Sequence, residues 1–214
     1  MCCNEWPFFA DPNAPWSRGN NFAIAFMQNH FRPSSTTAQQ IALFITTEQE
    51  STRFTIQTRW SGISEGFGFT LDPDTGIYSR QEVARNGDFT FVNFPSGRQQ
   101  PINVGPVDPD IAVQTNGNTD EADRQKGLTI TTDNPDHELT IYILNDEDVS
   151  TDAAMAINCV NFPNTRDYRY FIFSAGTDGV DETFNSRFLF TPCEDGTTVT
   201  ITPSQPLTHP TWVG

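Results

Sequence analysis

The run Arg53-Phe54-Thr55-Ile56-Gln57-Thr58-Arg59-Trp60 decides the fold class. Its apolar side chains at 54 and 56 fall on one side of an extended chain, and the polar ones between them fall on the other. A half-buried antiparallel strand needs this period of two, and a helix cannot use it. The run Thr198–Thr202 alternates in the same way. The sequence therefore predicts antiparallel strands that bury one face.

Short runs of similar character recur along the chain. They are rich in Phe, Ile, Val and Thr and are bounded by Gly, Pro, Asn and Asp. The expected strands are Phe22–Phe26, Ile41–Thr46, Arg53–Trp60, Phe67–Leu71, Phe89–Phe94, Ile111–Thr115, Leu128–Thr132, Leu139–Leu144, Tyr168–Ser174, Ser186–Thr191 and Thr197–Thr202. One short helix is expected over Asp146–Ile157. The pattern predicts an all-β fold, a two-layer antiparallel β-sandwich of jelly-roll-like type.

A weak internal repeat supports the two-layer arrangement. Residues 43–56 align without gaps on residues 188–201, and each copy reads as an apolar strand, an acidic turn and a Thr-rich strand. These are the signals of a β-hairpin. Two copies favour a pseudo-symmetric sandwich, because a solenoid needs at least three. Pro203 and Pro206 follow the second copy, so we expect an open sheet edge that invites another strand.

Composition restricts the partners. The chain has 214 residues, which fits one β-sandwich domain, and its formal net charge of −15 repels nucleic acid and anionic membranes. No apolar run of about 18 residues occurs, so membrane insertion is not expected. Lys126 is the single lysine beside eleven arginines, which favours an extracellular setting. No signal peptide begins at Met1, so we interpret the sequence as a mature or edited secreted form rather than a cytosolic protein.

The chain divides into an N-terminal arm at residues 1–18, a β-sandwich domain at 19–204 and a C-terminal tail at 205–214. The arm has an unusual composition. Its aromatic residues are Trp6, Phe8, Phe9 and Trp16, and its prolines are Pro7, Pro12 and Pro15. Proline favours an extended chain and excludes a central strand. Such aromatic side chains need burial, either on this domain or on a neighbour.

Four cysteines allow three pairings, and the sequence does not choose among them. We expect one bridge, Cys159 to Cys193, joining two strands of the domain. Cys2 and Cys3 are then available to another subunit, since a bond between adjacent cysteines is strained. The spacing does not fit zinc.

Catalysis has little support in the sequence. Gly62-Ile63-Ser64-Glu65-Gly66 matches the Gly-x-Ser-x-Gly pattern, but that motif needs a strand-to-helix turn, which is not expected in an all-β chain. His137 beside Glu138 is more typical of a turn than of a catalytic pair. No pair among the 27 acidic residues stands out as a glycosidase site. Calcium is the better hypothesis, with Asp72, Asp74, Asp178 and Asp181 as loop ligands, although their spacing is not that of an EF-hand. Solvated acidic turns are the alternative interpretation.

Several motifs resemble one known family. The run Gly19-Asn20-Asn21-Phe22-Ala23-Ile24-Ala25-Phe26-Met27-Gln28-Asn29 resembles the "G-x-x-F-x-x-A-F-x-x-N" opening of the N-terminal domain of the IgG-Fc-binding-protein family. Residues 52–56 and 198–204 resemble its "T-x-V-T-I" strand, and residues 128–145 resemble its central "I-x-I-x-S-D-x-P-I-x-V-Y-x-x-N" stretch. The similarity spans about residues 19 to 204.

The resemblance implies an extracellular all-β domain with adhesive or structural roles and no established catalytic residues. The chain lacks the family's cysteine-rich von Willebrand-type domains, so no Fc-binding residues are transferred. We expect a non-enzymatic module that assembles head-to-tail with copies of itself into a filament or matrix, through Cys2, Cys3 and the arm's aromatic residues. The alternative is a monomeric recognition domain for glycan or protein ligands, and a glycosidase-like enzyme is a third hypothesis.

Overall fold

A computed structural model describes residues 17–27, 40–60, 63, 67–94, 113–114, 126–147, 150–159, 191, 193, 198 and 200. Within these ranges the chain forms β-strands and no α-helix. The first strand begins at Arg18, so the last residue of the predicted arm already belongs to a sheet. The expected strands Tyr168–Ser174, Ser186–Thr191 and Thr197–Thr202 lie wholly or almost wholly outside these ranges.

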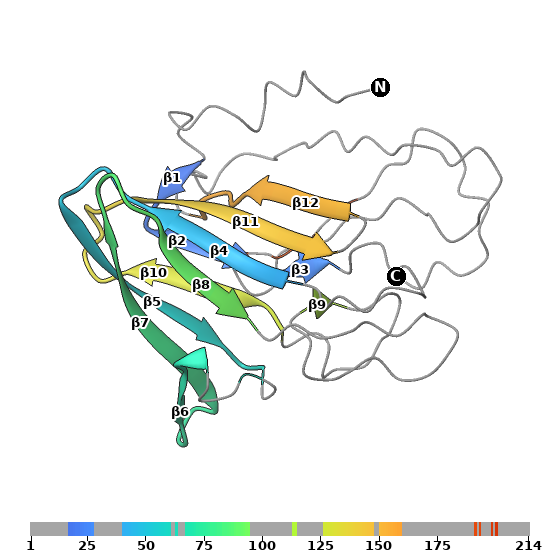
Figure 1. Cartoon of the computed structure of the whole chain (residues 1–214). Helices are drawn as coiled ribbons and strands as arrows, with labels where there is room; N and C mark the ends of the chain where they lie inside the picture. The colour runs from blue at the N-terminus through green and yellow to red at the C-terminus, as the bar shows by residue number, and fades with distance from the viewer. Residues whose placement is uncertain are drawn as a thin grey trace, which may run out of the picture.

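Two antiparallel sheets make up the described fold (Figure 1). Sheet A has the order β1 (Arg18–Gly19), β11 (Leu139–Glu147), β4 (Gln40–Thr46), β8 (Thr90–Phe94), with β12 (Ser150–Met155) also paired to β11. Sheet B has the order β2 (Asn21–Ile24), β10 (Leu128–Thr132), β5 (Ser51–Thr58), β7 (Ile77–Arg85), β6 (Thr70–Asp72). A short parallel pair joins β3 (Phe26–Met27) to β9 (Val113–Gln114). The predicted two-layer antiparallel β-sandwich is confirmed.

Short connections cross between the sheets at one end of the sandwich, on the left in Figure 1. Asn20 joins β1 to β2, residues 47–50 join β4 to β5, residues 86–89 join β7 to β8, and residues 133–138 join β10 to β11. Each connection makes an arch, with one strand in each sheet, and the arches stack in the same order in both layers. The two strands of each arch therefore face one another instead of pairing, whereas β6 pairs with β7 and β11 pairs with β12 within a sheet.

The hairpin predicted over residues 43–56 is wrong for this reason. β4 pairs with β8 and β11, whereas β5 pairs with β7 and β10. An apolar strand followed by an alternating strand gives the same signal for a hairpin and for an arch. The arch wins because it lets both strands bury their apolar side chains against each other. The second copy, residues 188–201, lies almost wholly outside the described ranges.

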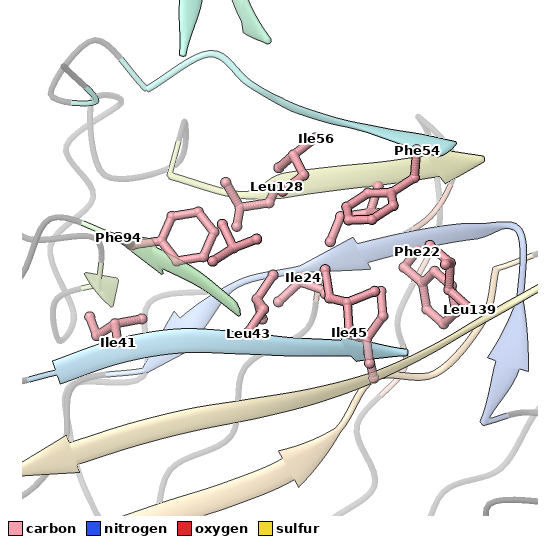
Figure 2. Packing of buried hydrophobic residues seen from close by; sticks show 14 of the residues in the cluster. Phe22, Ile24, Ile41, Leu43, Ile45, Phe54, Ile56, Phe94, Leu128 and Leu139 are labelled. Carbon is pink, nitrogen blue, oxygen red and sulfur yellow. The ribbon is translucent and has the colours of Figure 1, made fainter. Parts of the chain in front are cut away.

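The inner faces of the two sheets form one core (Figure 2). Its labelled members are each at most 2% exposed: Phe22, Ile24, Ile41, Leu43, Ile45, Phe54, Ile56, Phe94, Leu128 and Leu139. Burying one such side chain contributes about 1.5–3 kcal/mol. On β5 the buried Phe54 and Ile56 alternate with exposed Arg53 and Gln57, which confirms the predicted alternation.

Polar contacts fix the end at which the arches turn. The Thr47 hydroxyl oxygen lies 2.9 Å from the Thr52 hydroxyl oxygen and 2.8 Å from the Glu138 carbonyl oxygen. The Asn20 side-chain amide donates to the Pro135 carbonyl at 2.6 Å. Two arches, β1–β2 and β4–β5, are thus tied to the β10–β11 connection, so the backbone groups exposed by the turns find partners inside the protein.

The observed secondary structure differs from the sequence predictions at three places. The helix expected over Asp146–Ile157 is wrong, because Glu147 ends β11 and Ser150–Met155 forms β12, paired to β11 from Tyr142↔Met155 to Glu147↔Ser150. Helix propensity differs by only tenths of a kcal/mol per residue, so a strand ladder overrides it. β7 was not predicted, because most of its residues are polar and its few apolar residues do not alternate with them. The strand expected at Phe67–Leu71 shortens to β6.

A disulfide joins Cys159 to Cys193, as predicted, with a Cα–Cα distance of 5.6 Å. It links two bends rather than two strands. The Cys159 amide donates to the Asn21 carbonyl at 2.8 Å, so the bridge holds the later chain against the β2 edge of sheet B.

Replacing both bridged cysteines, Cys159→Ala with Cys193→Ala, is expected to lower the free energy of unfolding by about 3–4 kcal/mol, from the loop entropy of a bridge 34 residues apart. Urea denaturation measures the change. The control is Cys2→Ser with Cys3→Ser, which leaves the bridge intact. An unchanged midpoint in the first variant contradicts the bridge.

Gly19 fills a place with no room for a side chain. A Cβ atom there would overlap the side-chain amide of Asn158. Asn158 is 2% exposed, and its amide donates to the Arg18 carbonyl at 3.1 Å. Asn158 also forms an isolated antiparallel β-bridge with Phe22 of β2. Through these contacts it ties β1 to β2.

Gly19→Ala is expected to lower the free energy of unfolding by about 1–3 kcal/mol, because the overpacked Asn158 must shift. Gly127→Ala is the matched control, since a Cβ there meets its nearest atoms at 3.9 and 4.0 Å, an ordinary contact. Urea midpoints compare the two. Equal midpoints would mean that Asn158 moves aside without cost.

Candidate interaction surface on the outer face of sheet A

The outer face of sheet B is mostly polar, with Val83 as an exposed apolar residue on it. Its exposed or half-exposed residues include Thr55, Gln57, Thr129 and Thr131, which alternate with buried apolar ones. Antiparallel sheets with one solvated face show this alternation. Sheet B therefore provides an internal reference for an outer face adapted to solvent.

The outer face of sheet A is different, because aromatic side chains cross it. Phe91 of β8 stands opposite Phe44 of β4, and Phe44 stands opposite Tyr142 of β11. Met155 of β12 stands opposite Tyr142 and extends the line. The line runs across four strands, perpendicular to them, and directly opposed residues on one face are in contact distance.

The rings touch one another edge to face. Phe44 lies 4.8 Å from Phe91 and 6.4 Å from Phe89 between ring centroids, and Phe89 lies 6.0 Å from Tyr142. We call these four residues the aromatic face. Phe89 is 60% exposed and Phe91 48%, so the cluster is packed within itself and open to solvent above.

On one side of the aromatic face, the neighbouring strand positions are also uncharged, whereas Arg18 lies on the other side, opposite Thr140. The next line across sheet A holds Asn93, Ala42, Leu144 and Ala153. A contiguous apolar patch on an outer face is typical of an interaction site. Single exposed apolar residues need no such explanation, but four rings in mutual contact do.

The N-terminal arm meets the described fold close to this surface. Arg18 pairs with Thr140, two residues along β11 from Tyr142. Beyond that point the same edge of β11 is occupied by β12, whose following residue Ala156 donates its amide to the Ile141 carbonyl at 2.9 Å. The predicted assembly residues Cys2, Cys3, Trp6, Phe8, Phe9 and Trp16 lie outside the described ranges.

The sequence analysis missed the aromatic face, although a signal was present. Residues 41–45 form a continuous apolar run, Ile-Ala-Leu-Phe-Ile, in which Ile41, Leu43 and Ile45 point to the core. In an antiparallel strand, such a run means that both faces are apolar. Phe44 therefore had to emerge on the outside.

Asp72, one of the candidate calcium ligands, organises the β6–β7 turn. Its carboxylate accepts hydrogen bonds from the Thr75 hydroxyl at 2.8 Å and the Asp74 amide at 3.0 Å. Gly76 completes the turn with a φ of +68°, which favours glycine. The Thr75 hydroxyl, and then the Asp74 amide, lower the pKa of Asp72 below its ordinary value of 3.8. Asp178 and Asp181 lie outside the described ranges, so the calcium site stays a prediction.

Thr75→Val is expected to raise the pKa of Asp72 toward 3.8, because it removes the stronger of the two donors. The depressed folded-state pKa means that the ionised turn favours folding above the unfolded pKa and loses that effect as the pH falls through the folded value. NMR titration of the Asp72 carboxyl carbon measures the shift. Thr70→Val is the control, and identical titrations in both variants would contradict the Thr75 contact.

His137, the candidate catalytic residue, has a structural role in a turn. His137 lies in the β10–β11 connection, where its amide donates to the Asn134 carbonyl at 3.0 Å, in agreement with the predicted turn. Within the described ranges, no group of three or more His, Cys, Asp or Glu residues is placed to hold a metal ion. The described part of the chain contains no helix that is long and apolar enough to cross a membrane.

No protein-family model, curated protein or solved structure matches this chain. The resemblance to the IgG-Fc-binding-protein domain therefore stays a prediction that rests on its motifs. The structure gives one of those motif positions a physical meaning, since Gly19 is required by its contact with Asn158.

Proposed function

We propose that this chain is a non-enzymatic, secreted structural or adhesive module that assembles head-to-tail with copies of itself, through the N-terminal arm, into a filament or matrix. The observation that carries the proposal is the exposed aromatic face on sheet A. The domain offers an apolar surface on which Phe89 and Phe91 are exposed, and the arm offers four aromatic side chains that need burial.

Physical chemistry favours this association. Apolar burial contributes roughly 25 cal/mol per Å², and aromatic side chains have the largest areas to bury. The three prolines of the arm reduce the conformational freedom that is lost on docking. A contact between two different surfaces is heterologous, so it grows into a filament unless the rotation between copies closes a ring.

A secreted setting is supported by the Cys159–Cys193 bridge, since disulfides persist in oxidising compartments. The net charge of −15 would keep such assemblies soluble and limit their growth at low salt. In an oxidising compartment, the thiols of Cys2 or Cys3 on two copies could then form a disulfide that locks the joint, with molecular oxygen or an oxidised thiol carrier taking up the two electrons and two protons. No nucleic acid is expected as a partner.

The test is sedimentation velocity of the full chain at rising concentration. We expect assemblies whose size grows with concentration, and we expect them to vanish in the arm variant Trp6→Ala, Phe8→Ala, Phe9→Ala, Trp16→Ala. Trp212→Ala, which removes an aromatic from the other end of the chain, is the control and should assemble normally. Assembly of the arm variant at the wild-type level rules out the arm. A wild-type chain that stays monomeric would favour the alternative, a recognition domain for glycan or protein ligands.

A further inference from the structure

We infer that the aromatic face of one copy is the docking site for residues 6–16 of a second copy, and that the arm packs across the sheet instead of adding a strand to its edge. The inference rests on the proposed function, for which it names the receiving surface and the mode of contact. The open edge expected after the second hairpin copy lies outside the described residues, so the inference concerns the described sheet A alone.

The edges of sheet A do not suit the arm. On one side, β1 and β12 together occupy the edge of β11 from Leu139 to Glu147, so β12 is an edge strand of the described sheet there, and on the other side β8 is. Pairing to either edge strand needs a regular series of donated amides. Pro7, Pro12 and Pro15 donate none, and within residues 6–16 they leave at most four consecutive residues able to pair.

The aromatic face suits a proline-rich segment. Aromatic surfaces bind extended proline-rich chains, whose conformation is already close to the bound one. The line from Phe91 to Met155 crosses three strand spacings, about 14 Å at roughly 4.8 Å each. Eleven residues in an extended proline-type helix reach about 30 Å at roughly 3.1 Å per residue, so the arm is long enough to cover the line.

The direction of β1 favours a second copy over the arm's own domain. β1 runs along β11, whereas the aromatic line runs across the strands. Ser17 is 2% exposed, and Arg18 forms an ion pair with Glu48, so the chain is held in that direction up to residue 17. To cross its own face, the arm must turn sharply just before Ser17, where Pro15 restricts the backbone of residue 14 to extended conformations. Ala156 and β12 occupy the edge of β11 beyond Arg18, so the arm leaves that edge in either case, but a second copy can receive it in whatever direction it leaves.

The experiment uses two full-length variants with complementary defects. The arm variant described above keeps its aromatic face but lacks the arm's aromatic side chains. The face variant, Phe91→Thr with Tyr142→Thr, keeps the arm but loses two of the four rings. Threonine suits exposed strand positions, so the sheet should persist. Leu71→Thr with Val83→Thr is the matched control, because it removes two exposed apolar side chains from sheet B instead.

Each variant alone should be monomeric, and the control should assemble like the wild type. An equimolar mixture of the arm and face variants should form a heterodimer that grows no further, since it has one intact arm and one intact face. The heterodimer should bind at least about tenfold more tightly than the face variant binds itself, because interface aromatics dominate affinity. Sedimentation velocity and multi-angle light scattering measure mass and stoichiometry.

The contrary outcomes separate the two proposals. If the face variant assembles like the wild type, the aromatic face is not the receptor, while assembly through the arm stands. If the arm variant assembles alone, the arm is dispensable and the proposed function fails. If both variants are monomeric and the mixture is too, the arm does not dock on the face and the inference is overturned.

Discussion

The contact between the inner faces of sheets A and B governs the rest of this structure. β4 and β5 follow one another in the chain, and each carries apolar side chains at alternate positions. Laying Leu43 and Ile45 over Phe54 and Ile56 removes all four from water. That burial is possible only if the chain crosses from one layer to the other between them. The arch is thus the unit that joins the two sheets, beside the antiparallel pairs β6–β7 and β11–β12 within them.

The remaining architecture follows from stacking such arches. Once consecutive strands face each other, each must find its hydrogen-bonding neighbours among strands far away in sequence, as β4 does in β11 and β5 does in β10. The short turns then gather at one end. There the Thr47 hydroxyl donates to the Glu138 carbonyl, and the Asn20 side-chain amide donates to the Pro135 carbonyl. Asn158 and the Cys159–Cys193 bridge add a second hold on the β2 edge.

The outer face of sheet A departs from the alternation of buried apolar and exposed polar residues that the strands of sheet B show. Sheet B places polar residues outside, whereas sheet A places Phe44, Phe89, Phe91 and Tyr142 there. None of these rings belongs to the core between the two sheets, because the inner positions of the same strands fill it. Departures from a consistent pattern are expected at functional sites. This contrast between two faces of one domain is the strongest reason to regard the protein as a binding or assembling module.

The sequence by itself determined the strand character of the chain, because alternation such as Phe54 and Ile56 between polar residues is a local property. It also predicted the pairing of Cys159 with Cys193. It did not distinguish arch from hairpin, and it predicted a helix where β12 lies, because these outcomes depend on partners distant in sequence. The apolar run at residues 41–45 places Phe44 on the outside, but the assembly of the aromatic face was decided by tertiary structure. Its rings come from β4, β11 and the β7–β8 arch, and only the register between non-consecutive strands brings them together on one surface.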